Sequence, residues 1–374
     1  MGDMVMDDKK VNMVCSTCFF DNNFPGVAIK ENGRCNYCNS NEFSKKISEL
    51  TTSNLDQLRL VASQLRKERE RKGGKYDCII GASGGFDSSY VIYVAKRIME
   101  LNPLVVCYTN DFTKSLAKDN LKRLCDELNV DLKIVRSKKK FDKKQVRAFM
   151  QAFKDVGSYW GCCEFCVYVL EAVIYKFASE ENISTMLVSN NIYEGMATQY
   201  LTKEFKRDFM LNNISKLKLI KLLKILYYMV ISQYYFIRFK MEFFAPSRVK
   251  TIFHRSTVLS LARGNTSILK NITRVNITQY IPWDVDKIVK TLETEVGWKS
   301  PEKPYLPMRF DCILEDALID RTYKNATGVT LHTIMCNNLI YGGAKTKKEL
   351  EATVNKYEKE VAEENIQLLK DLKI

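Results

Sequence analysis

Residues 83–89, Ser-Gly-Gly-Phe-Asp-Ser-Ser, combine the residue types that a phosphate-binding loop requires. They follow a short apolar run of strand type at residues 76–82 and precede a helical pattern that continues to about residue 101. The two glycines allow tight turns and the close approach of a phosphate. The backbone N–H groups at the new helix N-terminus, together with the serine hydroxyls, can then bind an anion. The segment is therefore predicted to be an anion-binding loop between a strand and a helix.

The residues of this loop distinguish between two kinds of phosphate site. The Walker pattern G-x-x-x-x-G-K-S/T is absent, because no lysine follows the glycines. Instead, residues 83–89 resemble the SGGxDS loop of the PP-loop ATP pyrophosphatases, which bind ATP, release pyrophosphate and adenylate a substrate oxygen. The alternative interpretation is an ordinary Gly-Ser turn. The resemblance implies that Ser83 and Asp87 are catalytic and that ATP contacts Ala82, Ser83, Gly84, Gly85, Asp87, Ser88 and Ser89.

Polar side chains at the ends of two other predicted strands are candidates for the same site. Asn110 and Asp111 follow the strand predicted at residues 104–109, and Asn190 follows the one at 185–189. In an open parallel sheet, a nucleotide lies across the carboxyl ends of the strands, where the strand order switches. We therefore expect these three side chains to reach adenine, ribose or substrate, although Asn and Asp are also common turn-forming residues.

Four cysteines near the N-terminus occur as two close pairs, Cys15-x2-Cys18 and Cys35-x2-Cys38. This spacing matches a zinc ribbon, in which each pair supplies two thiolates to a tetrahedral ion. A segment this short has no core of its own, so metal binding would have to fold it. Because four thiolates leave no open coordination position, the predicted zinc is structural and not catalytic.

A second group of cysteines lies at residues 161–166, Gly-Cys-Cys-Glu-Phe-Cys, at the start of a predicted helix. Thiolates at a helix N-terminus are favoured by the helix dipole and can ligate a metal or act as nucleophiles. Cys163 and Cys166 share a helix face because they are three residues apart, and Cys312 would complete a three-cysteine site of iron–sulfur type. The competing interpretation is that these are free cysteines packed in a core.

The elements that must position these residues alternate along the chain. Strands are predicted at residues 76–82, 104–109, 131–135 and 185–189, separated by helical patterns, and such alternation indicates βαβ units and a parallel sheet. The predicted fold is therefore α/β, a parallel-sheet PP-loop domain (adenine nucleotide α-hydrolase-like) with an N-terminal zinc ribbon and a mostly helical C-terminal extension. The expected domains are a zinc ribbon at 1–45, a linking helix at 46–75, the ATP-binding PP-loop domain at 76–200, a helical insertion at 201–250 and a mixed or helical region at 251–374.

The composition of the 374 residues limits the compartment and the partners. Lys and Arg number 58 against 44 Asp and Glu, which gives a formal net charge of +14 and favours anionic partners. The first residues lack the apolar core of a signal peptide, so a reducing cytoplasm with free or metal-bound thiols is expected. The longest uncharged apolar run, residues 225–237, is too short to span a bilayer.

The segment at residues 216–240 is unusual because its lysines recur among leucines, isoleucines and tyrosines. A basic amphipathic helix of this kind can lie on an anionic membrane surface without being integral to it. It can also dock on a partner protein, and residues 217–240 are the expected docking surface for a partner subunit. The third alternative is a core helix whose lysines extend into solvent.

The order of these motifs resembles the N-acetyl sugar amidotransferase family of surface-glycan and lipopolysaccharide biosynthesis. Phe86 stands where that family usually has lysine, and residues 337–343 differ from the expected Ile-Arg-x-Gly type of block. The resemblance runs from about Cys15 to Leu350. It is carried by the two CxxC pairs, YDCIIGASGGFDSSY at 76–90, the Cys-x-x-Cys helix at 163–166, GWKSP at 297–301 and RFDC at 309–312.

This resemblance implies a reaction and its partners. The acetamido oxygen of a nucleotide-linked N-acetyl sugar would attack the α-phosphate of ATP, and pyrophosphate would leave with Mg²⁺ sharing its charge. Ammonia would then displace AMP and give an acetamidino sugar. The only two histidines, His254 and His332, leave little room for a glutaminase triad. The resemblance implies that a separate glutaminase, working with a cyclase-like subunit, supplies the ammonia.

Two other functions fit part of the sequence. A PP-loop tRNA sulfurtransferase would use the positive charge, the zinc and the cysteines at residues 162–166. A non-catalytic zinc-ribbon nucleic-acid binder would use the charge and the CxxC pairs but would leave the loop at residues 83–89 unexplained. Nucleic acid is therefore not the expected partner.

Overall fold

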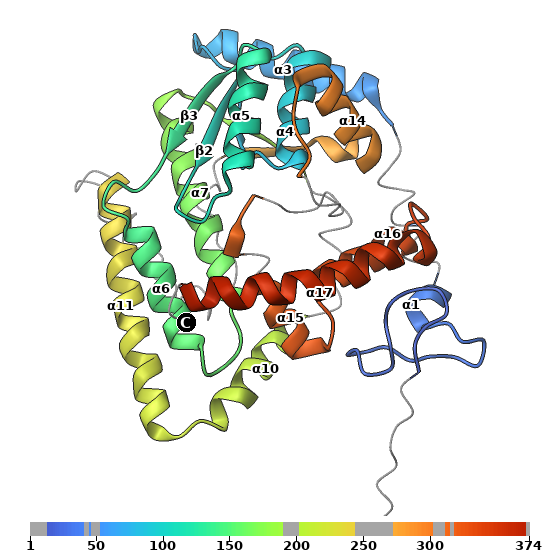
Figure 1. The fold of residues 1–374 in the computed structure, drawn as a ribbon. Helices are drawn as coiled ribbons and strands as arrows, with labels where there is room; N and C mark the ends of the chain where they lie inside the picture. The colour runs from blue at the N-terminus through green and yellow to red at the C-terminus, as the bar shows by residue number, and fades with distance from the viewer. Residues whose placement is uncertain are drawn as a thin grey trace, which may run out of the picture.

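The computed structural model describes residues 13–40, 45, 53–189, 202–243, 272–301, 311–314 and 318–371 (Figure 1). Its centre is a five-stranded parallel sheet in the order β3-β2-β1-β4-β5. The chain adds β2 and β3 on one side of β1 and then returns to add β4 and β5 on the other, so the strand order switches at β1. The strands are β1 (Cys78–Gly81), β2 (Pro103–Tyr108), β3 (Asp131–Val135), β4 (Thr185–Val188) and β5 (Thr273–Asn276).

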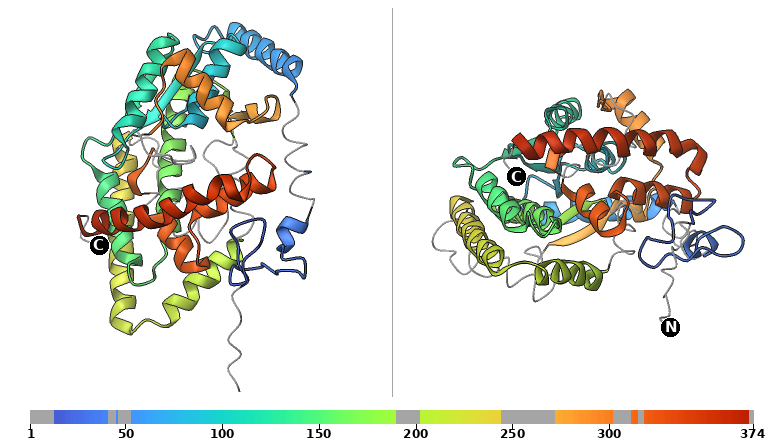
Figure 2. Two further views of the ribbon diagram at one scale, coloured as in Figure 1. Left: turned by 45° about the vertical axis from the view of Figure 1, so that its right-hand side comes forward. Right: turned by 60° about the horizontal axis from the view of Figure 1, so that its bottom comes forward.

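The helices form three groups around this sheet (Figures 1 and 2). The sheet is covered by α3 (Leu55–Lys72), α4 (Phe86–Tyr93), which continues as a π-helical turn (Val94–Ile98), α5 (Ser115–Glu127), α7 (Trp160–Glu180) and α14 (Val285–Val296). The second group is α6 (Phe141–Phe153), α10 (Lys203–Ser215) and α11 (Leu219–Phe243). The third is α15 (Asp320–Thr327), α16 (Leu331–Tyr341) and α17 (Lys347–Asp371), beside the short α1 (Asn36–Asn39); a 3-10 turn (Ile277–Gln279) follows β5.

Alternate side chains of the central strands enter two apolar cores, one on each face of the sheet. Cys78 and Ile80 contribute to a core shared with α3, α4, α5 and α14. Ile79 contributes to the opposite core, which α7 closes with Val173 and Ile174. Because both faces are covered, the buried strands are nearly continuous apolar runs, as expected for a parallel sheet.

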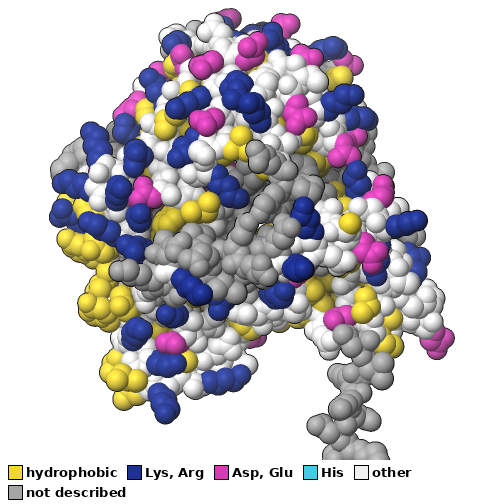
Figure 3. Space-filling model, in the orientation of Figure 1, with side chains coloured by type: hydrophobic (Ala, Val, Ile, Leu, Met, Phe, Trp, Pro, Cys, Tyr) yellow, Lys and Arg dark blue, Asp and Glu magenta, His cyan; other side chains and the backbone are white. Residues whose placement is uncertain are grey.

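Helices α6 and α11 pack side by side in opposite directions at one edge of the molecule. Gln145 Nε2 of α6 donates to Ser232 Oγ of α11 at 3.0 Å, and Lys221 at the start of α11 pairs with Asp155 just beyond α6 at 3.0 Å. The buried face of α11 contributes Phe236 to the apolar core between them. Hydrophobic side chains also gather on the outside of this edge of the molecule (Figure 3).

The cysteine-rich segment at residues 13–40 packs against the C-terminal helices. The ring of Phe20 lies 6.4 Å from that of Tyr341 in α16, and both belong to one apolar cluster with α15 and α17. Phe19 N donates to Asn337 Oδ1 at 2.8 Å, and Lys347 Nζ donates to the carbonyl oxygen of Cys15 at 2.8 Å. The two ends of the described chain therefore share one core.

The predicted fold class is confirmed by the parallel sheet, the four-cysteine segment and the helical C-terminal region. All four predicted strands are present, and residues 203–243 form two helices. The fifth strand, β5, was not predicted, because Thr-Arg-Val-Asn contains one apolar residue and its first two residues are exposed at the sheet edge. Together with α14, it brings part of the region at 251–374 into contact with the sheet domain.

Candidate functional site

The predicted phosphate loop lies at the carboxyl end of β1, in the middle of the sheet. β1 lies between β2 and β4, where the strand order switches, and open α/β sheets bind their ligands at such a point. Helix α4 begins at Phe86 with Gly85 as its N-cap, and no side chain among the described residues caps it. This helix N-terminus therefore presents backbone N–H groups at the loop, as an anion site requires.

Gly84 has a position in this loop that only glycine can take. Its φ is +91°, and a Cβ atom there would lie 1.9 Å from the carbonyl oxygen of Ala117 in α5. On its other side, Trp298 Nε1 donates to the carbonyl oxygen of Gly84 at 3.1 Å. The indole of Trp298 is buried, so the loop is held firmly between α5 and this side chain.

Trp298 reaches the loop because the segment after α14 is tied to α5. Asn120 Nδ2 donates to the carbonyl oxygen of Lys299 at 2.8 Å, and Asn120 Oδ1 accepts from Lys299 N at 2.9 Å. Arg123 donates to the carbonyl oxygen of Gly297 at 3.0 Å. The block at 297–301 was recognisable in the sequence, but its support of the phosphate loop was not predicted. A contact between residues more than 170 positions apart leaves no local signal.

The serine hydroxyls of the loop form long hydrogen bonds with its own backbone. Ser88 Oγ donates to the carbonyl oxygen of Gly85 and accepts from Ser83 N, both at 3.3 Å. Ser83 Oγ accepts from Gly85 N at 3.4 Å. These distances exceed the usual range for hydrogen bonds, so phosphate oxygens could replace these partners at little cost.

The other predicted loop residues differ in their access to a ligand. Asp87 lies half-buried in the first turn of α4. Ser89 is fully buried, and its hydroxyl has no hydrogen-bond partner among the described residues. Ala82 is also buried. The structure therefore gathers residues 82–89 at one end of β1, and their contact with ATP stays a prediction.

Asn110 and Asp111 both follow β2, but they have different partners. Asn110 Oδ1 accepts from Phe112 N at 2.8 Å and from Thr113 Oγ1 at 3.3 Å. This is an Asx turn, the alternative that the sequence left open. Asn190, the third candidate, lies outside the described residues.

Asp111 pairs with cations at the carboxyl end of the neighbouring strand β3 and the start of α6. Its carboxylate lies 2.9 Å from Lys143, 3.4 Å from Lys140 and 3.5 Å from Arg136. The hydrogen bond from Lys143 lowers the pKa of the Asp111 carboxyl. Three cations around one carboxylate leave a net positive charge, and we call Arg136, Lys140 and Lys143 the basic cluster. The sequence signal for it is the run RSKKK at residues 136–140, which directly follows a strand.

The structure brings Cys166 and Cys312 into one apolar core beside the end of β2. Ile313 N donates to the carbonyl oxygen of Phe112 at 3.0 Å, so the segment of Cys312 runs along the loop after β2. Cys162, Cys166 and Cys312 share this core. The side chain of Cys163 lies outside the described residues, so the predicted cluster of Cys163, Cys166 and Cys312 stays a prediction.

A buried polar pair lies in the same region and was not predicted. Tyr108 Oη, at the end of β2, donates to the Asp142 carboxylate of α6. Burial raises the pKa values of both groups. No sequence pattern distinguished this aspartate from the exposed acids of other helices.

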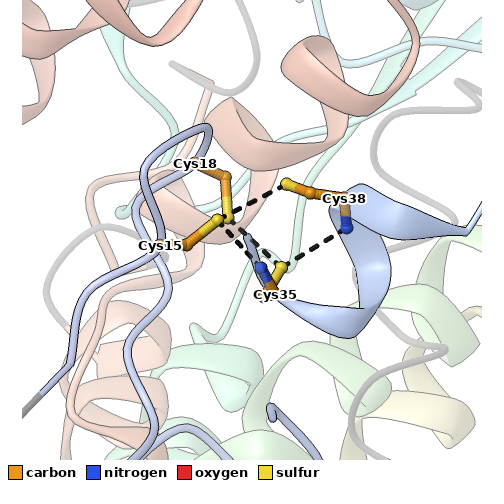
Figure 4. A group of neighbouring side chains, drawn as sticks. All are labelled: Cys15, Cys18, Cys35 and Cys38. Carbon is orange, nitrogen blue, oxygen red and sulfur yellow. Dashed lines mark hydrogen bonds between the residues drawn. The ribbon is translucent and has the colours of Figure 1, made fainter. Parts of the chain in front are cut away.

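The four N-terminal cysteines form a metal-binding group (Figure 4). Their sulfur atoms all lie within 4.8 Å of one another, and three of the four residues are buried. The Sγ atoms of Cys15 and Cys38 are 3.7 Å apart, and those of Cys18 and Cys35 are 3.8 Å apart. A tetrahedral zinc ion with metal–sulfur bonds of about 2.3 Å requires sulfur–sulfur separations of about 3.8 Å. The geometry therefore fits zinc bound by all four thiolates.

Hydrogen bonds to the sulfur atoms favour the thiolate forms that zinc requires. The backbone N–H of Cys35 donates to Cys15 Sγ at 3.2 Å, and the backbone N–H of Cys38 donates to Cys35 Sγ at 3.4 Å. Tyr341 Oη of α16 donates to Cys18 Sγ at 3.2 Å. Among the sulfur atoms themselves, hydrogen bonds from Cys18 and Cys38 lower the pKa of the Cys35 thiol, and the same contacts raise the pKa values of Cys18 and Cys38. Tyr341 links the metal group directly to the C-terminal helices.

Comparison of the sequence with known proteins gives only partial matches. No family model matches the sequence. An uncharacterized protein from Methanocaldococcus jannaschii is 30% identical over 82 residues, so the match spans 22% of this chain and only 30% of that protein.

Three solved structures are similar to this chain at low sequence identity. An ammonia-dependent NAD synthetase from Campylobacter jejuni has a TM-score of 0.29 and 14% identity, covering 58% of this chain and 100% of that one. A tRNA thiolase from Methanococcus maripaludis with its iron–sulfur cluster has a TM-score of 0.31 and 13% identity, covering 96% and 88%. An NMN synthetase from Francisella tularensis has a TM-score of 0.29 and 14% identity, covering 67% and 90%.

Proposed function

We propose that this protein is a PP-loop ATP pyrophosphatase that adenylates a substrate oxygen. The observation that carries the proposal is the SGGFDSS loop at the carboxyl end of β1, with Gly84 held against α5 and the N-terminus of α4 beside it. ATP would bind across this end of the sheet with its phosphates on the loop. The backbone N–H groups of the loop would then stabilise the charge that develops on the departing pyrophosphate.

The other polar groups at the carboxyl ends of the strands would act according to their chemistry. Mg²⁺, when bound with ATP, would neutralise part of the phosphate charge, and Asp87 offers the carboxylate oxygen that Mg²⁺ prefers. Ser83 and Ser88 would exchange their long local hydrogen bonds for phosphate oxygens. The basic cluster would hold a second anionic group, such as the diphosphate of a nucleotide-linked substrate.

The substrate class in this proposal is a nucleotide-linked N-acetyl sugar. Its acetamido oxygen attacks the α-phosphorus of ATP, the bond to the pyrophosphate breaks, and an imidate–AMP forms. Ammonia adds to the activated carbon, AMP leaves with the former acetamido oxygen, and the product is an acetamidino sugar. The resemblance to the N-acetyl sugar amidotransferases supports this choice, and so does the basic cluster at the carboxyl end of β3, two strands away from the loop.

Ammonia would come from a separate glutaminase that works with a cyclase-like subunit, because this chain shows no glutaminase centre among its described residues. His332 is 8% exposed, its ring stacks on Tyr357 at 3.9 Å, and burial lowers its pKa to about 4. It therefore cannot serve a solvent-accessible nucleophile. The other histidine, His254, lies outside the described residues.

A tRNA sulfurtransferase is the second candidate, and one observation favours it. Cys166 and Cys312 lie in one core beside the end of β2, close to the edge where ATP would bind. In this alternative, the cysteines would serve sulfur transfer or hold an iron–sulfur cluster. Three results would support the sulfurtransferase over the amidotransferase. The protein would purify with bound tRNA, its affinity for RNA would fall steeply as the salt concentration rises, and the product would be a thiolated RNA.

The ammonia requirement gives a direct test of the amidotransferase proposal. The isolated chain, given ATP, Mg²⁺ and a panel of nucleotide-linked N-acetyl sugars, is expected to modify one of them with high ammonium but not with glutamine. Free ammonia is the nucleophile, so the rate should rise as pH increases and ammonium loses its proton. Mass spectrometry would detect a product in which an oxygen is replaced by an NH group. Efficient glutamine hydrolysis by the chain alone would contradict this division of labour.

A further inference from the structure

Helix α11 is apolar on two opposite sides, and only one of them is covered by the protein. Its inner side contributes Phe236 and Phe239 to the core with α6. A helix that is hydrophobic all round is normally buried all round. Its outer side, however, carries eight apolar residues that are each between 53% and 76% exposed: Leu219, Ile220, Leu223, Leu226, Tyr227, Val230, Tyr234 and Met241. We call these eight residues the apolar ridge.

The apolar ridge is straight and convex. At 3.6 residues per turn, its members fall within roughly a third of the helix circumference along a helix about 37 Å long. Helix α11 lies at an outer edge of the molecule in Figure 1 and in the right-hand view of Figure 2. Hydrophobic side chains project along that edge (Figure 3). A straight, protruding row of apolar side chains matches a flat apolar surface better than a shaped protein pocket.

The charges carried by α11 and the residues just before it are positive as far as residue 241, although one of them, Lys221, pairs with Asp155 just beyond α6. Residues 209–241 contain no Asp or Glu but six basic residues, Lys216, Lys218, Lys221, Lys224, Arg238 and Lys240. At the far end of α11, Glu242 binds Ser137 Oγ at 2.8 Å and thereby joins the helix to the basic run at residues 136–140. A second copy of the chain would present the same positive charges and be repelled. An anionic surface would be attracted at both ends of the helix.

We propose that α11 lies flat on an anionic lipid bilayer, with the apolar ridge in the headgroup–acyl boundary and the lysines against the phosphates. This arrangement is typical of interfacial amphipathic helices, which combine an apolar face with Lys and Arg beside it. Tyr227 and Tyr234 suit that boundary, where one end of the ring is apolar and the other wet. No helix among the described residues is long and apolar enough to cross a bilayer. The inference is independent of the reaction that the protein catalyses.

Flotation of the full chain with vesicles tests this assignment. We expect binding to vesicles that contain phosphatidylglycerol, little binding to phosphatidylcholine alone, and weaker binding as salt increases. Leu223→Glu with Leu226→Glu should reduce the bound fraction roughly tenfold or more, because the ridge loses apolar contact and gains repulsion. Lys218→Glu with Lys224→Glu should mainly remove the dependence on anionic lipid.

The control substitution is Leu60→Glu in α3. Leu60 and Leu226 are both 63% exposed leucines on long helices, so Leu60→Glu makes the same chemical change away from the ridge. It should leave vesicle binding unchanged, and thermal unfolding should show that all variants remain folded. Equal loss with Leu60→Glu, or no vesicle binding by the natural chain, would overturn the proposal. A stable dimer of the chain would also overturn it. The same holds if the chain does not bind lipid and its glutamine-dependent activity with a glutaminase is lost when the apolar ridge is substituted.

Discussion

Asp87→Ala is expected to reduce the formation of AMP and pyrophosphate from ATP at least about a hundredfold, a loss typical of removing one group that stabilises transition-state charge. Asp87 is the acidic residue of the first turn of α4, and it is the carboxylate nearest in sequence to the two glycines of the loop. Ser83→Ala should act in the same direction, because it removes a hydroxyl that lies within the loop. Pyrophosphate release with the modified sugar as co-product is the measurement.

Asp56→Ala is the matched control for this experiment. Asp56 is also an aspartate in the first turn of a helix, but it lies on α3 and its side chain is 92% exposed. Its replacement should leave the rate unchanged. Thermal unfolding of each variant separates loss of chemistry from loss of fold. Unchanged pyrophosphate release in both Asp87→Ala and Ser83→Ala would remove the loop from the mechanism.

Cys15→Ser combined with Cys35→Ser is expected to abolish zinc binding and to loosen the C-terminal helices. Zinc bound by four thiolates contributes roughly 10–16 kcal/mol of apparent free energy in small zinc-dependent peptides, far more than an ordinary side-chain contact. The segment at residues 13–40 packs on α16 and α17 through Tyr341 and Lys347. Its unfolding should therefore expose those helices to proteolysis. Elemental analysis should find one zinc per natural chain and none in the double variant.

Cys336→Ser provides the control for this second prediction. Cys336 is also fully buried and belongs to the same apolar cluster, but it is not among the four grouped thiols. Its replacement buries a hydroxyl and should cost about 1–3 kcal/mol of unfolding free energy, yet it should leave the zinc content unchanged. Absence of zinc from the natural chain, or its retention by the double variant, would refute the zinc ribbon.

The sequence predicted the elements that carry strong local patterns. Strands β1, β2 and β4 were recognisable as apolar runs because both of their faces are buried, whereas β3 is an exposed edge strand that still carries three apolar residues. The cysteine pairs were recognisable because metal geometry dictates their spacing. β5 escaped notice because Thr273 and Arg274 are exposed at the sheet edge. Two other features could not be predicted because they join segments that are distant in the sequence. They are the hydrogen bond from Trp298 to Gly84 and the pairing of Asp111 with the basic cluster. Such contacts exist only once the sheet has brought strand ends together.

For residues that the sequence allowed to be interpreted in two ways, the structure shows the surroundings that distinguish the interpretations. Asn110 proved to cap a turn, whereas its neighbour Asp111 faces three cations. The segment 216–240 suggested either a core helix or a surface helix, and α11 is both, because one side is buried on α6 and the other is exposed. Hydrophobic periodicity could not show this, since the helix is apolar around most of its circumference.

The origin of the oxygen in AMP tests the central claim, that ATP activates a substrate oxygen by adenylation. The full chain would be given ATP, Mg²⁺, ammonium and the accepted nucleotide-linked sugar carrying a heavy oxygen isotope in its acetamido carbonyl. If that oxygen attacks the α-phosphorus, the AMP recovered after ammonia displacement must carry the label, and pyrophosphate must carry none. Unlabelled AMP, or ADP and phosphate in place of AMP and pyrophosphate, would contradict the mechanism.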